Sequence, residues 1–257
     1  MTMTSEDVFE QSAYAVRFDW GLDGLVCLAP ISDTVVIVDV LSFTTAVSIA
    51  VDRGATVYPY RFKEESATLF AESVDALLLN KRDEGGLSLS PTSLQQVESG
   101  QKLVLPSPNG STLASTAREY GKWVVAGSLR NAQAVAQTVM ESGKSVAVIA
   151  AGERWLNGNL RPALEDVLGA GAILSDANPC ALSPEARSAV SVFRSVQENL
   201  LSTLLDCASG RELIARGYQE DVVMASRLNE TGVVPVLVNG AFQAMDRRQN
   251  HVLPYSE

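Results

Sequence analysis

Residues 35–45 read Val-Val-Ile-Val-Asp-Val-Leu-Ser-Phe-Thr-Thr, and this stretch decides the fold. Its continuous apolar, β-branched start predicts a strand over Val35–Asp39 that is buried on both faces, as in a parallel sheet. The hydroxyls that follow the acid predict a helix start, with the helix over Thr45–Asp52. A strand that leads directly into a helix is typical of an α/β protein.

The same alternation continues outward on both sides. Further apolar runs predict strands over Leu25–Leu28, Thr56–Tyr60, Ala76–Leu79, Leu103–Leu105, Trp123–Ala126, Val146–Ala150 and Val234–Val238. Helical patterns lie over Glu64–Val74, Leu113–Tyr120, Ala132–Ser142, Pro162–Ser175, Pro184–Asp206 and Gly210–Gly217. We therefore expect a three-layer α/β/α sandwich around a mostly parallel or mixed central sheet. Residues 1–257 are expected to form a single domain, with a boundary near 178–183 as the alternative.

The composition limits the location and the partners. No run of about 18 apolar residues is present, and no basic segment precedes an apolar one at the start, so we expect neither a membrane span nor a signal peptide. Three widely spaced cysteines predict reduced thiols and a cytoplasmic protein. A net charge of −10 argues against a nucleic-acid partner. A homodimer is the default expectation for such a fold.

An acidic protein that binds a small anion needs a local source of positive potential, which a metal ion, arginines or helix N-termini can supply. In open α/β sheets, ligands bind beyond the carboxyl ends of strands. The residues that follow each predicted strand are therefore the candidates for the site.

Two of these segments carry hydroxyls and backbone N–H groups at a helix start. Asp39 ends its strand and can ligate Mg²⁺, while Thr44 and Thr45 can hold a phosphate at the following helix. The alternative is an ordinary turn with Thr44 as N-cap. The second segment, Asn109-Gly110-Ser111-Thr112, predicts backbone N–H groups that converge on an anion, or else an ordinary turn and cap.

Two further segments carry carboxylates and guanidinium groups. Glu153 and Arg154 follow Gly152, so they could bind a metal and a phosphate, or form an exposed pair. Arg161 precedes Glu165 and Asp166 at a helix start. These two acids either complement the helix dipole, with Arg161 and Glu165 as an i,i+4 pair, or complete an all-oxygen metal site.

The sequence lacks the residues that several classes of phosphatase and metal enzyme need. His251 is the single histidine of the sequence, which argues against histidine-rich metal sites. Neither Cys207 with Arg211 nor Cys180 with Arg187 has the spacing of a Cys-x5-Arg phosphatase loop. Oxygen-ligated Mg²⁺ is the expected electrophile.

The ordered set of segments resembles the 2-phosphosulfolactate phosphatase family of coenzyme M biosynthesis. The matching pieces span residues 33–240, nearly the whole chain. They are Val38-Asp39-Val40-Leu41 with Thr44-Thr45, Asn109-Gly110-Ser111-Thr112, Ala151-Gly152-Glu153-Arg154, Ala163-Leu164-Glu165-Asp166 with Gly169-Ala170-Gly171-Ala172-Ile173, and Leu228-Asn229 through Val233–Gly240.

The resemblance implies an α/β/α phosphatase that hydrolyses 2-phospho-3-sulfolactate to 3-sulfolactate and phosphate with Mg²⁺. It implies that Asp39, Glu165 and Asp166, with Glu153, hold the metal ion. Arg154, Arg161 and the segment Asn109–Thr112 would bind phosphate or sulfonate. Asp39, Glu165 and Arg154 are the implied catalytic residues, with Asp39 as nucleophile or general base.

The sequence departs from the family pattern at three places. Ser42 stands where the family has an arginine, and Gly169 where it has a cysteine. A Gly-Glu-Arg segment of the family that leads to Gly-Phe-Asp-x-Gly-Asn-Ser-Pro is replaced by Asn80–Pro91. These departures leave two alternatives open, a phosphatase for another phospho-hydroxyacid and an inactive anion-binding protein on the same fold.

Overall fold

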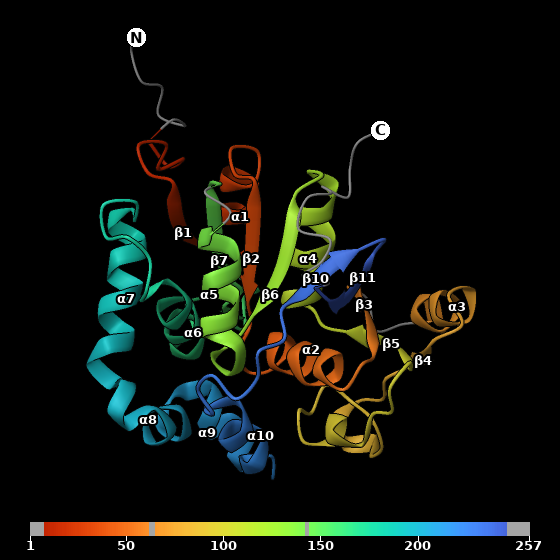
Figure 1. Ribbon diagram of the computed structural model, residues 1–257. Coiled ribbons are helices and arrows are strands. Elements are labelled where there is room, and N and C mark those ends of the chain that lie inside the picture. The colour runs from red at the N-terminus through yellow and green to blue at the C-terminus, as the bar shows by residue number, and fades with distance from the viewer. Residues whose placement is uncertain (1–7, 62–64, 142–143, 246–257) are drawn as a thin grey trace.

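A mixed central sheet organises the protein (Figure 1). The computed structural model describes residues 8–61, 65–141 and 144–245, and in these ranges the sheet has nine strands. Their spatial order is β1 (Val16–Trp20), β7 (Val146–Ala150), β2 (Thr34–Val38), β6 (Trp123–Gly127), β10 (Pro235–Val238), β11 (Ala241–Ala244), β3 (Thr56–Tyr60), β5 (Lys102–Pro106) and β4 (Leu77–Leu78).

The sheet consists of two parallel groups joined by a hairpin. Strands β1, β7, β2 and β6 pair in parallel, and so do β3, β5 and β4. The antiparallel hairpin β10–β11 lies between them and pairs with each group through one residue pair, Val236 with Val125 and Phe242 with Val57. The predicted mixed α/β sheet is confirmed.

Alternate residues of the central strand β2 pack into two separate cores. Val36 and Val38 belong to one core and Val35 and Ile37 to the other, and all four are fully buried. Helices α5 (Ala132–Glu141), α6 (Leu164–Leu174) and α7 (Pro184–Val196) contribute to the first core, and α1 (Gly21–Leu28), α2 (Phe43–Asp52) and α4 (Gly110–Glu119) to the second. A strand covered on both faces has no polar face, which explains the continuous apolar run.

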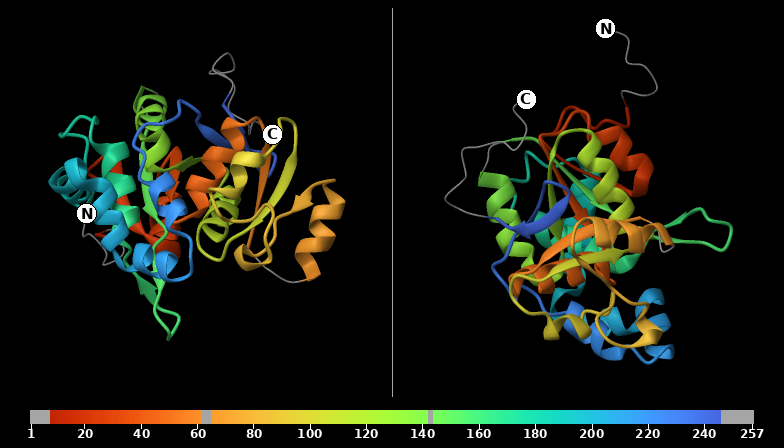
Figure 2. Two further views of the ribbon diagram at one scale, coloured as in Figure 1. Left: turned by 90° about the horizontal axis from the view of Figure 1, so that it is seen from below. Right: turned by 90° about the vertical axis from the view of Figure 1, so that its right-hand side faces the viewer.

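The remaining elements lie outside these layers. Helices α8 (Leu200–Asp206), α9 (Ala208–Ala215) and α10 (Gln219–Ala225) form a group below the sheet in Figure 1. The hairpin of β8 (Glu153–Arg154) and β9 (Leu160–Arg161) projects from the body in both views of Figure 2. Helix α3 (Glu65–Ser73) flanks β4, and the single turns are η1 (Arg82–Glu84), η2 (Ser93–Gln96), η3 (Leu129–Asn131) and η4 (Gln197–Asn199).

Two predicted elements are wrong. The strand expected over Leu25–Leu28 is the end of helix α1, where Leu25 and Leu28 are fully buried and Val26 is 46% exposed, as helical spacing requires. The helix expected over Pro184–Asp206 is broken by η4, whose three residues are all outside the core. The break redirects the chain so that Leu200 and Leu204 pack against the first core.

Other predictions differ less. The strands β1 and β11 and helix α10 were not expected, because charged residues interrupt the apolar pattern of β1 and the other two elements are short. The predicted helix ends Glu64 and Ser142 lie outside the described residues. Ser183 caps α7 as expected, with its Oγ accepting the N–H of Ala186. Within the described ranges no helix is long and apolar enough to cross a bilayer.

Candidate active site

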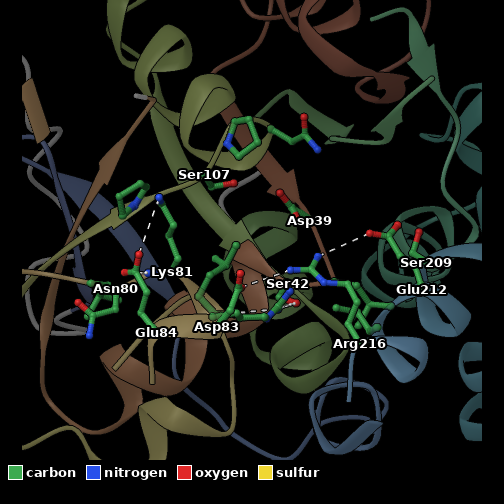
Figure 3. A pocket seen from close by; sticks show the side chains of 18 of the residues that line it. Asp39, Ser42, Asn80, Lys81, Asp83, Glu84, Ser107, Ser209, Glu212 and Arg216 are labelled. Carbon is green, nitrogen blue, oxygen red and sulfur yellow. Dashed lines mark hydrogen bonds and ion pairs between the residues drawn. The ribbon is translucent and has the colours of Figure 1, made fainter. Parts of the chain in front are cut away.

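A pocket of about 710 Å³ opens where β2, β4 and β5 end and where α9 approaches them (Figure 3). Of the predicted site residues, Asp39, Asn109 and Glu153 line it. Residues from the segment after β4 and from α9 close the other side. The pocket therefore joins parts of the chain that are up to about 180 residues apart in sequence.

Asp39 lies directly after β2 and is held by backbone donors. Its Oδ1 accepts the N–H of Phe43 at 3.2 Å, and its Oδ2 accepts the N–H of Gly110 at 2.9 Å. The residue is 7% exposed. Burial raises the pKa of Asp39 to about 6, and the charge of Glu165 adds to this while the two N–H donors oppose it. An oriented carboxylate thus faces the pocket.

Gly110 is required by the close approach of α4 to Asp39. A Cβ at this position would lie 2.2 Å from a ring carbon of Phe43 and 2.7 Å from Asp39 Oδ2. Glycine alone lets its backbone N–H reach the carboxylate. The Asn109-Gly110 turn, predicted to bind an anion, therefore has one of its N–H groups on Asp39.

The four predicted hydroxyl groups are bound to backbone atoms. Thr44 Oγ1 donates to Asp39 O at 2.8 Å, and Thr45 Oγ1 donates to Val40 O at 2.7 Å. Ser111 Oγ donates to Leu105 O at 2.9 Å and Thr112 Oγ1 to Pro108 O at 2.7 Å. These contacts fix the two helix starts beside Asp39, and phosphate binding by the hydroxyls stays a prediction.

Glu153 begins the projecting hairpin and meets Asn109 in the pocket. Asn109 Nδ2 donates to Glu153 Oε2 at 3.2 Å, which links two of the predicted segments. Burial raises the pKa of Glu153 to about 7, with further contributions from the charges of Asp39 and Glu165. The carboxyl of Glu153 therefore ionises at a higher pH than an ordinary glutamate.

Glu165 and Asp166 lie in the first turn of α6, and both are nearly fully buried. Asp166 accepts the N–H of Val40 at 2.7 Å and the N–H of Gly152 at 2.8 Å, so it ties together the chain after β2 and the chain after β7. Burial raises its pKa well above the usual range, and the charges of Asp39 and Glu165 raise it further. We call Asp39, Glu153, Glu165 and Asp166 the acidic side of the site.

The two predicted arginines of this region lie on the hairpin. Arg154 donates to Gly158 O at 2.9 Å within the hairpin, and the residue is exposed. Arg161 donates to Ser209 Oγ at 3.1 Å, and its guanidinium lies 5.9 Å from the ring centre of Trp155. Neither residue lines the pocket. The structure brings them near the site without directing them into it.

Sequence reasoning missed the two arginines that line the pocket, Arg82 and Arg216, which we call the arginine side. Arg82 Nη2 donates to Ser42 Oγ at 2.6 Å, so a guanidinium does lie beside the position where the resemblance predicts one. Arg82 belongs to the segment Asn80–Pro91, which departs from the family pattern in other residues. The basic pair Lys81-Arg82 next to a predicted strand was the available signal.

Comparison with known proteins decides the family. The profile of the 2-phosphosulpholactate phosphatase family matches residues 26–240. The chain belongs to the 2-phosphosulfolactate phosphatase family. A probable 2-phosphosulfolactate phosphatase of Thermotoga petrophila is 29% identical over 228 residues, which cover 84% of this chain and 96% of that protein. One of Synechococcus is 33% identical over 226 residues, covering 80% and 89%, and one of Carboxydothermus hydrogenoformans is 30% identical over 213 residues, covering 78% and 84%.

The family consists of phosphoric monoester hydrolases. In this protein, the acidic side of the site suits a hard cation. Its donors are all oxygens, which is the chemistry that Mg²⁺ prefers. Burial raises the pKa values of Asp39, Glu153 and Asp166, and neighbouring acids raise them further, so a divalent cation bound there would favour their charged forms. In the described part of the chain, no three acidic, histidine or cysteine side chains already converge as a metal site. Metal binding would need a side-chain rotation, and Glu153, the least buried of the four, is the most able to make one.

Proposed function

We propose that this member of the family hydrolyses 2-phospho-3-sulfolactate to 3-sulfolactate and phosphate in a Mg²⁺-dependent reaction. The observation that carries the proposal is the buried, backbone-oriented carboxylate of Asp39 at the floor of a 710 Å³ pocket. The relatives that are named probable 2-phosphosulfolactate phosphatases support the substrate. The unpaired state of the three cysteines agrees with a cytoplasmic enzyme.

Asp39 is the group that reacts. The N–H groups of Phe43 and Gly110 fix both of its oxygens, so the carboxylate keeps one orientation as a nucleophile toward phosphorus or as a base toward water. Its burial makes either role more effective than in water, because the charged form is poorly solvated.

Glu153 reaches the pocket beside Asn109, where its carboxylate can face a bound cation. Asp39, Glu165 and Asp166, with Glu153, are the residues that would hold Mg²⁺. When bound, the ion would supply Lewis-acid stabilisation of the charge that develops on the phosphoryl oxygens.

The test is phosphate release from a panel of small esters, which includes 2-phospho-3-sulfolactate and 2-phospholactate, with Mg²⁺ and with EDTA. We expect release with Mg²⁺ only, and a loss on the order of 1,000-fold or more in Asp39→Asn. The control Asp19→Asn replaces a half-buried acid of β1 that does not line the pocket. Absence of release for every ester from folded protein would contradict the proposal and favour an anion-binding protein.

A further inference from the structure

The arginine side has an arrangement that the chemistry of Asp39 does not explain. Arg82 follows β4 and Arg216 follows α9, yet both guanidinium groups lie against the ring of Tyr218, at 5.4 Å and 5.7 Å from its centre. Burial lowers the pKa of Arg82, the charge of Asp221 opposes this, and the nearby charge of Arg216 lowers the pKa further. Two like charges are thus held together in one wall of the pocket.

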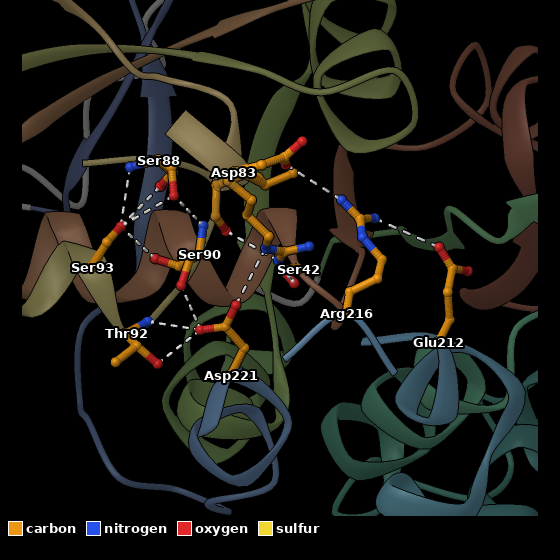
Figure 4. A network of polar contacts seen from close by, with 11 residues as sticks. Ser42, Asp83, Ser88, Ser90, Thr92, Ser93, Glu212, Arg216 and Asp221 are labelled. Atoms are coloured by element: carbon orange, nitrogen blue, oxygen red, sulfur yellow. Dashed lines mark hydrogen bonds and ion pairs between the residues drawn. The ribbon is translucent and has the colours of Figure 1, made fainter. Parts of the chain in front are cut away.

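Arg82 is fixed by a buried acid. Its Nε lies 3.2 Å from Asp221 Oδ2, and the two side chains are 10% and 2% exposed. The N–H is not aligned for a hydrogen bond, so the contact is mainly between charges. The other oxygen of Asp221 accepts from Ser90 Oγ at 2.6 Å and from Thr92 N and Oγ1 at 3.1 and 2.7 Å, as Figure 4 shows.

This anchoring leaves part of the guanidinium for a ligand. Nη2 donates to Ser42 Oγ, with Leu89 O at 3.5 Å as a second, long contact. In the ranges that the structure describes, Nη1 of Arg82 has no hydrogen-bond acceptor. A guanidinium presents its donors in a rigid fork that suits the oxygens of carboxylate, sulfonate or phosphate groups.

Arg216 is held loosely at the same wall. Its guanidinium lies between Asp83 Oδ1 and Glu212 Oε1, each 3.6 Å away, and its side chain is 47% exposed (Figure 4). Exposed ion pairs of this kind contribute little, because water competes for both charges. The guanidinium can therefore turn to a ligand at little cost.

A purely structural role explains the placement of Arg82 but not that of Arg216. The ion pair of Arg82 with Asp221 fastens the segment after β4 to α10, and it would do so without a second arginine. Arg216 has no buried partner among the described residues, and it lies near a like charge. Repulsion between two cations is relieved when an anion binds between them.

We propose that Arg82 and Arg216 form a second anion subsite, which binds the non-reacting anionic group of the substrate while Asp39 faces the phosphoryl group. The inference rests on the proposed function for the identity of the ligand. It assigns substrate selection to the arginine side, and it predicts a preference for phosphate esters that carry an additional sulfonate or carboxylate.

The first experiment compares kcat/KM for three esters in wild type and Arg216→Gln. The esters are 2-phospho-3-sulfolactate, 2-phospholactate and isopropyl phosphate, which differ by one sulfonate and one carboxylate. If the subsite binds the sulfonate, the preference for the first ester over the second falls about tenfold or more in the variant, mainly through KM. If it binds the carboxylate, the preference for the second over the third falls instead. Equal changes for all three esters, or none, would overturn the proposal.

Arg211→Gln is the matched control, since it removes an equal charge from an exposed arginine of α9, the helix that Arg216 follows. Arg211 forms its ion pair with Asp206 and does not line the pocket. Its preferences among the three esters should stay within about twofold of wild type. Arg82→Lys is a second test variant. It keeps the positive charge but removes the forked guanidinium group, so it should also lower the preference for the ester with the additional anionic group.

A calorimetric titration with 3-sulfolactate separates this proposal from the proposed function. Binding by wild type that is about tenfold weaker in Arg216→Gln supports the subsite even if no ester is hydrolysed. Equal affinity of the two proteins for 3-sulfolactate, in an enzyme that does hydrolyse the ester, would sink the subsite and leave the proposed function standing.

Discussion

The acidic side, through Asp39 and Glu153, and the arginine side line the same pocket but are held in different ways. On the acidic side, backbone N–H groups bind two of the four carboxylates, as Phe43 and Gly110 do for Asp39 and Val40 and Gly152 do for Asp166, while Asn109 Nδ2 donates to Glu153. On the arginine side, other side chains hold the charges, as Asp221 and Ser42 do for Arg82. The geometry of the acidic side is thus part of the sheet and its helix starts, whereas that of the arginine side depends on a few substitutable residues.

The difference suggests a division of labour. Most side-chain substitutions leave a backbone donor in place, which suits groups that must keep a reactive orientation. Side-chain contacts can be exchanged, which suits groups that select among substrates. Substitutions on each side test this division of labour, and the largest effect on stability is expected at Asp221.

Asp221→Ala should be the most damaging to stability. It leaves the buried guanidinium of Arg82 without its counter-charge and removes the acceptor of Ser90 and Thr92. We expect a loss of about 3–5 kcal/mol in the free energy of unfolding, measured by urea denaturation. Glu220→Ala, at the exposed neighbour on α10, is the control and should change it by less than about 0.5 kcal/mol. If Asp221→Ala lost as little stability as Glu220→Ala, the ion pair of Arg82 and Asp221 would not be what holds the arginine side in place.

Gly110→Ala tests the acidic side by crowding it. The added methyl group would overlap Phe43 and Asp39 Oδ2, so we expect a loss of about 1–3 kcal/mol of stability. Activity should fall further than stability explains, because the N–H bond to Asp39 is displaced. Gly232→Ala is the control, since a Cβ there meets no atom within 4 Å. Thermal unfolding and turnover measured on both variants would show whether the close approach matters.

Glu153→Gln should stabilise the metal-free protein in a pH-dependent way. The folded-state pKa of about 7 lies above the usual value of 4.5, so the folded state holds this proton more tightly than the unfolded state. Ionisation of the partly buried Glu153 side chain lowers the free energy of unfolding. This loss is absent at low pH, grows as the pH rises from about 4.5 to 7, and reaches its full size above pH 7.

The variant removes this loss, so unfolding in EDTA should show a gain of about 3 kcal/mol at pH 8 and nearly none at pH 4.5. The control is Glu98→Gln, at an exposed position away from the pocket. A gain that is equal at both pH values would mean that the effect does not come from this ionisation.

Glu212→Gln should have the smallest effect on stability. It removes one exposed partner of Arg216, and surface pairs of this kind contribute about 0–1 kcal/mol. If Arg216 serves the substrate rather than the fold, the freed guanidinium should bind 3-sulfolactate as well as or better than wild type does. A loss of more than about 2 kcal/mol in the urea midpoint analysis would instead give Arg216 a structural role.

Much of the acidic side could be predicted because it follows the strands directly. Asp39 comes after the most regular apolar run of the chain, and Asn109 and Glu153 come after two more. In an α/β sheet the ends of strands gather ligands, so local pattern and position were sufficient to bring these residues to one pocket. The error at Leu25–Leu28 arose because four apolar residues fit both a strand and a buried helix segment. The error at Pro184–Asp206 arose because a turn without glycine or proline interrupts the helical pattern.

By itself, the sequence determined the α/β class, the buried central strand and the acids that end the strands, because hydrophobic period and chain position are local properties. Only the tertiary structure decided that Arg82 and Arg216 reach the pocket and that Arg154 and Arg161 do not line it. The sequence separation of Arg82, Asp221 and Ser42 hides their contacts, since a side chain's partners across the fold follow from packing and not from local spacing. The charge balance of the site is a property of that packing.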